Sequence, residues 1–444
     1  MMADAGLAAA AGRGGGVRAW RSGASGFGRR VAGVRLAGAR QALLLGGGAA
    51  LGQGVAVLSA PLLTRLYDVA AFGMFGSFSA AASCLACVAT LRLDQAILLE
   101  RDEDGAGDVL RLCVLSVGAV TLVAGLGAAG AAGRAPGAVL ALLPLAVACG
   151  CVVPALTLWF VRRERFGPVA AYGASRSGFA VALQGLGGWL GVPGAGLLVG
   201  GQVAGQALAA ALLARAGGAG LRAALCGGWS VARLRGAASR HRGFALYGAP
   251  QVLLRLLSTS LPAILLPVFF GAAEAGLFWL AYRMLVLPQQ VLTESLRPVF
   301  FRRAAALHAE GGDVRGAALR LAGGLGALCL PVVAVLAFAG PALFGAVFGA
   351  AWRGAGHDAA MIALAWGVET MQMPSAVLVS VLGRQRAYLG IEAASLVGRG
   401  AALCAGAAWG GPDLAVGLYA AAWAATNAGV IAWMAWPGAR GGAA

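Results

Sequence analysis

Long apolar segments recur along this chain from residue 41 to residue 436, and they constrain its fold more than any other feature. Each is about 20 residues long, the length that an α-helix needs to cross the hydrocarbon core of a bilayer. There are twelve, at 41–61, 72–96, 109–132, 138–160, 169–191, 196–216, 244–270, 276–300, 319–340, 358–382, 389–410 and 414–436. Because a segment inside a bilayer must satisfy its own backbone hydrogen bonds, we expect all twelve to be helices. The sequence therefore predicts an all-α, polytopic membrane protein.

The basic side chains are 34 arginines and no lysine, and they give the chain a net charge of +17. In a soluble protein this charge would suggest nucleic-acid binding. Here 60% of the residues are hydrophobic and the mean hydropathy is +0.80, which excludes a soluble protein of two or three domains. We therefore expect anionic membrane lipids and an anionic cargo as partners, and no nucleic acid.

The arginines are distributed unequally between the two sides of the membrane. If the N-terminal tail is cytoplasmic, 27 arginines lie on the cytoplasmic side, three (Arg65, Arg134 and Arg353) lie outside, and four fall within the segments. Short loops rich in Lys and Arg stay in the cytoplasm. The count predicts twelve spans with both termini cytoplasmic.

The order of segments and loops predicts two halves. Residues 1–40 carry seven arginines and no apolar core, so we expect a disordered basic tail and no signal peptide. Six segments at 41–216 form an N-terminal bundle, and six at 244–436 form a C-terminal bundle. The Gly/Ala/Arg-rich stretch 217–243 is a cytoplasmic linker between them, and 437–444 is a cytoplasmic tail.

Two short repeats relate the halves. Phe72-Gly73-Met74-Phe75 and Ala275-Gly276-Leu277-Phe278 open the second and eighth segments, 203 residues apart, and Gly107-Asp108-Val109 recurs as Gly312-Asp313-Val314 after 205 residues. Parallel halves related by an axis along the membrane normal are typical of transporters, with the cargo site between them. The repeats therefore predict two pseudo-symmetric six-helix bundles.

Several motifs resemble a known family in the correct order along the chain. They are 61–75 (PLLTRLYDVAAFGMF), 91–98 (LRLDQAIL), 281–288 (AYRMLVLP), 348–353 (FGAAWR) and 382–385 (LGRQ). Together they are similar to the bacterial polysaccharide, or O-antigen type, flippases of the multidrug/oligosaccharidyl-lipid/polysaccharide exporter superfamily. The resemblance covers about residues 41–436.

This resemblance implies a function. The two bundles would form a V and use alternating access to move an undecaprenyl-pyrophosphate-linked oligosaccharide from the inner to the outer leaflet of the bacterial cytoplasmic (inner) membrane. The product would serve O-antigen, exopolysaccharide or capsule synthesis. A polysaccharide polymerase and a chain-length regulator are candidate partners.

Arg255 is the first candidate for the pyrophosphate ligand. It lies about eleven residues into its segment, roughly 16 Å deep, where it cannot reach the interface. Arginine binds phosphate oxygens in bidentate fashion and keeps its charge. The alternative is a buried pair with an acid on another helix.

Three further arginines are pyrophosphate candidates. Arg283 lies roughly 10 Å deep from the outer side, and Glu294, eleven residues later, shares its helix face. Arg176 and Arg399 occupy the fifth segment of each half and could flank the cytoplasmic mouth. Snorkelling to the interface is the alternative for Arg176 and Arg283.

Three acids complete the set of candidate residues. Glu369 lies near the middle of the bilayer and, like Glu294, is a candidate for ion coupling or for an ion pair with an arginine. Binding of a cargo hydroxyl is a further alternative for Glu369. Asp94, with Arg92, ends the second segment and is interpreted as a cytoplasmic gate or a local fold contact.

Other classes of function are less well supported. His241, His308 and His357 all fall in loops, and no Ser/His/Asp, Cys/His or metal-ligand pattern is present, so we expect no catalytic residue, metal or cofactor. A membrane-embedded glycosyltransferase would need a long outer loop with acids or histidines. A small-molecule or multidrug antiporter of the same superfamily and a non-transporting scaffold of polysaccharide assembly remain alternatives.

Overall fold

A computed structural model of the chain describes residues 47–48, 50–100, 102–130, 137–191 and 194–436. These residues are helical and contain no strand. The first half contains the apolar helix Ala50–Leu66, whose end is α2 (Ala60–Leu66), followed by α3 (Val69–Ala89), the 3-10 helix η1 (Leu93–Leu98), α4 (Glu103–Gly130), α5 (Gly137–Ala141), α6 (Leu143–Arg162), α7 (Phe166–Trp189) and α8 (Ala195–Cys226). The predicted tails 1–40 and 437–444 lie outside the described residues.

The second half follows a short connecting helix, α9 (Val231–Arg240). Its elements are the π-helix η2 (Phe244–Gly248), α10 (Ala249–Phe270), α11 (Ala272–Ala309), α12 (Val314–Phe348), the 3-10 helix η3 (Ala350–Trp352), α13 (Arg353–Val381), α14 (Gln385–Trp409) and α15 (Gly411–Ala435). With α5 and α6 counted as one pass, the described residues contain a helix at each of the twelve predicted segments. The predicted fold class is confirmed.

Length and composition alone identify eight of these helices, within the described residues, as able to cross a membrane. The helices α7, α11 and α14 are not among the eight, and each contains one of the embedded arginines, Arg176, Arg283 and Arg399 respectively. The helices also run past the predicted bounds, as α11 does by ending at Ala309. Hydropathy detects only the part of a helix that lies in lipid. The helix itself can continue into water, because its backbone hydrogen bonds do not depend on the surrounding solvent.

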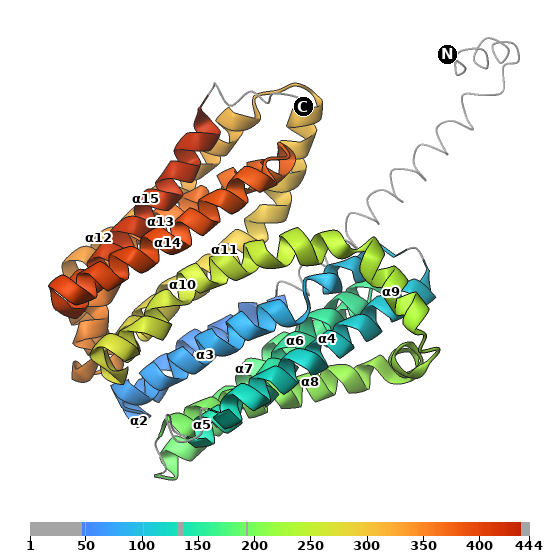
Figure 1. Cartoon of the computed structure of the whole chain (residues 1–444). Coiled ribbons are helices and arrows are strands. Elements are labelled where there is room, and N and C mark those ends of the chain that lie inside the picture. Colours follow the sequence, from blue (N-terminus) through green and yellow to red (C-terminus); the bar gives the residue numbers. More distant parts are fainter. Residues whose placement is uncertain (1–46, 49, 101, 131–136, 192–193, 437–444) are drawn as a thin grey trace, which may run out of the picture.

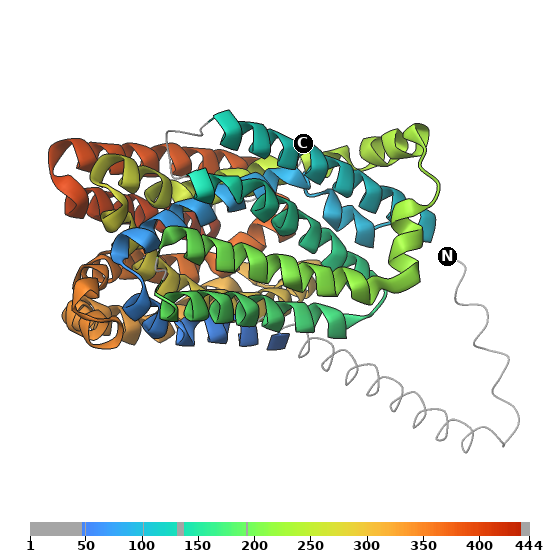
Figure 2. The same cartoon turned by 90° about the horizontal axis from the view of Figure 1, so that it is seen from below.

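The helices form two lobes, seen as the α2–α8 group and the α10–α15 group in Figure 1 and again from below in Figure 2. We call them the first and the second lobe. They meet along α3, which packs against α10 and α11. The junction between the halves therefore runs along one central helix of the first lobe.

Two glycines of the predicted repeat meet at this junction. A side-chain carbon added to Gly73 would overlap the carbonyl oxygen of Ala272, and one added to Gly276 would overlap that of Val69. The two contacts are reciprocal, because each glycine touches the residue four positions before the other. Close approach of two backbones requires glycine. The 203-residue repeat therefore has a structural basis: its two copies pack on each other.

Side chains close the end of the junction at which Gly73 and Gly276 meet. Trp352 Nε1 donates a hydrogen bond of 3.1 Å to the carbonyl oxygen of Thr64, and the Trp352 ring meets Phe72 edge-on at 5.0 Å between centroids. Trp352 and Phe72 are buried. The two lobes are thus tightly packed at the end that carries Arg65 and Arg353, which the sequence assigns to the outside.

Much of the predicted linker 217–243 is helical. The helix α8 bends at Gly218, whose φ is +57°, and α9 follows as a separate helix. Glu100 Oε1 accepts hydrogen bonds from Arg240 Nη2 at 3.0 Å and His241 Nε2 at 2.8 Å, which tie the end of α9 to the first lobe. The bounds of the linker and bundles stay a prediction.

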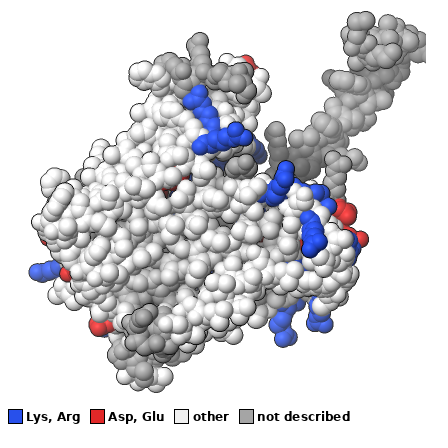
Figure 3. All heavy atoms as spheres, viewed as in Figure 1, with Lys and Arg blue, Asp and Glu red and all other residues white. Residues whose placement is uncertain are grey.

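On the face seen in Figure 3, basic side chains gather mainly toward the end of the molecule that carries α9. This agrees with the unequal count in the sequence. The molecule therefore has one arginine-rich end and one tightly packed end.

Candidate functional site

A cavity lies between the lobes, below the tightly packed end. It consists of two adjoining hollows of 460 and 300 Å³ that share Ser79, Ser83, Arg176 and Gln202. Its walls come from α3, α6, α7 and α8 of the first lobe and from α10 and α11 of the second. We call it the central cavity.

The charged side chains of the central cavity are mostly basic. Arg92, Arg176 and Arg283 line it, with Asp94 as the only acid among its lining residues. Within the described part of the chain, no ion pair forms on Arg176 or Arg283. The Arg283 guanidinium carbon lies 5.8 Å from the centre of the Phe75 ring. A charge kept inside a membrane protein without an acid is suited to an anionic ligand.

The inner mouth of the cavity has strained backbone. Leu91 and Arg92 have φ of 48° and 58°, in the left-handed region that non-glycine residues rarely adopt. Arg92 Nε and Asp94 Oδ1 are buried without a hydrogen-bond partner. Both residues line the central cavity, and no ion pair between them is formed in the described structure; their role as a gate stays a prediction.

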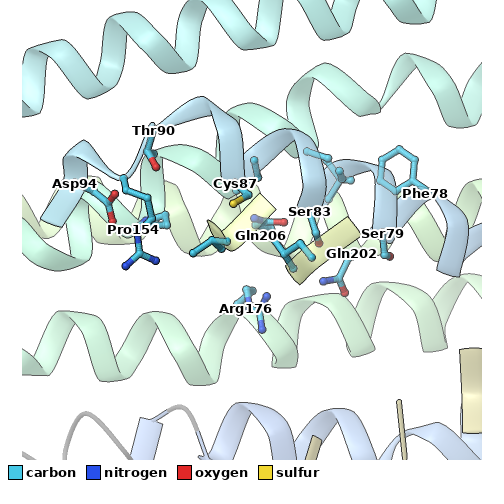
Figure 4. A pocket seen from close by; sticks show the side chains of 18 residues that line it. Phe78, Ser79, Ser83, Cys87, Thr90, Asp94, Pro154, Arg176, Gln202 and Gln206 are labelled. Carbon is cyan, nitrogen blue, oxygen red and sulfur yellow. The ribbon is translucent and has the colours of Figure 1, made fainter. Parts of the chain in front are cut away.

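Uncharged polar residues line the cavity in helical pairs, and the sequence reasoning missed them. Ser79 and Ser83 lie one turn apart on α3, and Gln202 and Gln206 lie one turn apart on α8. Figure 4 shows both glutamines close to Arg176. Polar side chains at i and i+4 in otherwise apolar segments are the signal that could have identified them.

Aromatic side chains form the outer part of the cavity. Trp279 and Tyr282 line it, with ring centroids 6.4 Å apart, and Trp279 Nε1 is buried without a hydrogen-bond partner. An indole with an unused donor beside polar groups can stack on a sugar and donate to it.

The other two predicted arginines lie elsewhere. Arg255 and Arg399 line a separate hollow of 20 Å³ inside the second lobe, together with Glu369 and Glu392. This volume suits about one water molecule. We call these four residues the second-lobe cluster. The four candidate arginines therefore divide into two pairs: Arg176 and Arg283 share a cavity, whereas Arg255 and Arg399 share a small hollow with two acids. Their role in binding the cargo stays a prediction.

Arg399 is held by its neighbours in this cluster. It is buried, donates a hydrogen bond of 3.2 Å from Nη2 to Thr426 Oγ1, and has its guanidinium carbon 5.8 Å from the centre of the Trp423 ring. Arg255, by contrast, is exposed. Glu369 lines the same hollow as both arginines, and its predicted roles stay predictions.

Glu294 does not line the central cavity, although it lies eleven residues after Arg283 on α11, and it is exposed. Eleven residues make about three turns of helix, roughly 16 Å, which carries the side chain beyond the cavity. The predicted pairing of the two residues on one cavity-lining stripe is therefore not seen.

Comparisons with known proteins agree with this architecture. Residues 197–356 match the family model described as "Polysaccharide biosynthesis protein". No curated protein sequence matches the chain. The fold is similar to that of the lipid II flippase MurJ in an inward closed conformation, with a TM-score of 0.69 at 8% identity over 88% of this chain and 87% of that one.

Multidrug transporters have the same fold. A MATE family transporter of the MOP superfamily in an inward-facing conformation gives a TM-score of 0.67 at 13% identity, over 89% of this chain and 93% of that one. A transporter of the same description in an outward-facing conformation gives 0.56 at 12% identity, over 89% and 94%.

The helices and the central cavity define a multi-pass membrane protein with the fold of the MOP superfamily transporters. The resemblance to the polysaccharide branch of this superfamily, predicted from the motifs, is confirmed by the match over residues 197–356.

Proposed function

We propose that this protein is a flippase for an oligosaccharide linked to a polyprenyl pyrophosphate. The observation that carries the proposal is the pair Arg176 and Arg283, which line one cavity and form no ion pair within the described residues. Two guanidinium groups can share the oxygens of one pyrophosphate. The matched polysaccharide biosynthesis family supports the same class of cargo.

In this proposal the inner end is cytoplasmic. The pyrophosphate enters past Arg92, moves to Arg176 and then to Arg283, while the isoprenoid tail stays in the lipid. The sugars contact Gln202 and the Trp279 ring. Rocking of the lobes then separates Gly73 from Gly276 and opens the outer end. The protein would act in the bacterial cytoplasmic membrane with both termini inside, in O-antigen, exopolysaccharide or capsule synthesis, alongside a polymerase and a chain-length regulator.

The second-lobe cluster has a different part in the proposal. Two arginines and two glutamates line the same small hollow, so their charges balance. Glu369 and Glu392 are the groups that could exchange a proton during the cycle, and otherwise they hold Arg255 and Arg399 in place.

A multidrug antiporter is the second candidate, because transporters of that kind have this fold. The arginines of the central cavity favour an anionic cargo over a cationic drug. Proteoliposomes that contain a fluorescent polyprenyl-pyrophosphate oligosaccharide test the difference. We expect protein-dependent movement of this lipid between leaflets and no transport of a cationic dye. The opposite pair of results would establish the antiporter.

A further inference from the structure

A third large hollow lies at the arginine-rich end, outside the central cavity. It has a volume of 690 Å³ and lies between the end of α9, the π-helix η2 and the first turn of α14. Its polar lining includes Arg240, His241, Gln251, Gln385 and Arg386. It therefore lies between the linker helix α9 and the second lobe. We call it the vestibule.

The charge of the vestibule is positive. No acid is among its lining residues. Glu100 lies behind Arg240 and His241 and pairs with both, at 3.0 and 2.8 Å. Arg386 is exposed and forms no ion pair within the described part of the chain. Glu100 thus pairs with Arg240 and His241, whereas Arg386 has no acid beside it in the vestibule, and an anion would balance its charge.

The rest of the lining suits an anion that carries an apolar chain. Phe244 and Leu389 are apolar and lie in the same hollow as the arginines. The hollow also reaches Gln385 at the start of α14, where the first amides of the helix add to the positive field. The volume is larger than a phosphate needs, and it can hold an anionic head together with the first carbons of a lipid.

The vestibule is separated from the central cavity by the start of α10. Gly248 lines the vestibule, and a side-chain carbon at this position would lie 3.8 Å from Arg92 Cγ. Arg92 in turn lines the central cavity. Gln251 faces the vestibule, whereas its neighbour Val252 faces the central cavity. One turn of helix therefore divides the two spaces.

We propose that the vestibule is a docking site that binds the diphosphate end of an isoprenoid-linked cargo before the cargo enters the central cavity. This rests on the proposed function. The order of basic groups is then Arg386 and Arg240 in the vestibule, Arg92 at the wall, and Arg176 and Arg283 inside. The vestibule raises the local concentration of cargo beside the central cavity. Removal of its basic side chains therefore weakens the binding of cargo and leaves the translocation step intact.

Binding to the detergent-purified full chain tests the site. We use the Arg283→Ala variant, so that the central cavity contributes less, and geranylgeranyl diphosphate as the probe. Removal of the Arg386 side chain (R386A) in this background should weaken binding about tenfold, the equivalent of about 1.4 kcal/mol. Arg302→Ala, an exposed arginine of α11 that does not line the vestibule, is the matched control and should change nothing. Equal binding by R386A and R302A overturns the proposal.

Two further probes identify the source of the anion. Inorganic pyrophosphate should compete weakly, because it lacks the apolar chain, and phosphatidylglycerol should not displace the prenyl diphosphate. If phosphatidylglycerol binds with the same dependence on Arg386 and displaces the prenyl diphosphate, the vestibule is a phospholipid site and the proposal is wrong.

Transport separates this proposal from the proposed function. In proteoliposomes with wild-type Arg283, R386A should raise the cargo concentration for half-maximal rate about tenfold and leave the maximal rate unchanged. If the wild-type protein moves no lipid-linked oligosaccharide, the proposed function fails. If it moves the lipid and R386A behaves like R302A, only the docking site fails.

Discussion

The central cavity and the second-lobe cluster each contain two arginines at membrane depth, and their surroundings differ. Arg176 and Arg283 line a cavity of several hundred Å³ with uncharged polar groups beside them. Arg255 and Arg399 line a space of 20 Å³ that also contains two glutamates. Arginines that face open space and uncharged polar groups are available to a ligand, whereas arginines that share a small hollow with two acids can balance their charges there.

The largest expected effect is in the central cavity. Arg176→Ala and Arg283→Ala should each reduce lipid transport about 100-fold, because each removes charge-assisted hydrogen bonds of about 1.5–3 kcal/mol to the cargo. The leaflet-exchange rate in proteoliposomes measures this, at equal protein incorporation. Lysine at either position should retain part of the rate, since it keeps the charge and loses the bidentate geometry.

Arg302→Ala is the control for both variants, because it makes the same charge change at an exposed position. Normal transport by both alanine variants would remove the basis for the pyrophosphate site. Arg255→Ala sharpens the comparison: if it alone abolishes transport, then the ligand site is the second-lobe cluster.

Arg399 should affect stability instead. Its replacement by methionine leaves Glu369 and Glu392 with one arginine in the same hollow and removes the hydrogen bond from Arg399 to Thr426. A hydrogen bond of a charged group contributes about 1.5–3 kcal/mol. We expect a lower midpoint of thermal unfolding in detergent and normal transport per folded molecule. A double variant, Arg399→Met with Glu392→Gln, should recover part of the loss. Unchanged thermal stability in the single variant would mean that the cluster does not stabilise the lobe.

The packed outer end gives a third test. Gly73→Ala places a carbon against the Ala272 carbonyl, so the arrangement in which the lobes are packed at this end should become less stable and transport should fall about tenfold, which corresponds to about 1.4 kcal/mol. Gly178→Ala in α7 is the control, because nothing lies within 4 Å of the added carbon. Labelling of a cysteine introduced at Ser79 from the outer side should increase in Gly73→Ala alone. Identical labelling in both variants would show that this contact does not close the cavity.

The smallest effect concerns the contact between the linker and the first lobe. Burial alone would raise the pKa of Glu100, but hydrogen bonds from His241 and Arg240 hold it below its ordinary value of 4.5. Arg162 Nη1 also donates to the Glu100 carbonyl oxygen, at 2.5 Å, and this bond does not titrate. Because the pKa is lower in the folded state, the stabilisation is complete above pH 4.5 and is lost as the pH falls through the lowered value.

Limited proteolysis between α8 and α9 measures this loss. Cleavage should increase below pH 4.5 in the wild-type protein. Glu100→Gln should be cleaved faster at neutral pH and respond less to acid. Equal pH dependence in the two proteins would rule out Glu100 as the titrating group.

Much of the fold could be predicted because its causes are local. A run of apolar residues long enough to cross a bilayer has to be helical wherever it packs, so all twelve helices were found from the sequence. The repeat containing Gly73 and Gly276 was also visible, and its glycines meet at the lobe junction. The helical extension of α8 and the separate helix α9 were missed, because hydropathy carries no signal outside the lipid.

The candidate site could be predicted only in part. Depth along a segment identified Arg176 and Arg283 as candidates, but it ranked Arg255 above them. The paired polar residues Ser79, Ser83 and Gln202 went unnoticed, since none carries a charge.

The sequence by itself determined that this chain crosses the membrane as two six-helix halves and that four arginines lie within the segments. Only the tertiary structure decided which of them lie among acids. The reason is physical: Glu369 and Arg255 are on different helices, and the packing of α13 on α11 and α15, together with that of α10 on α14, brings them to the same small space. Depth is a property of one helix, whereas charge pairing depends on how several helices pack.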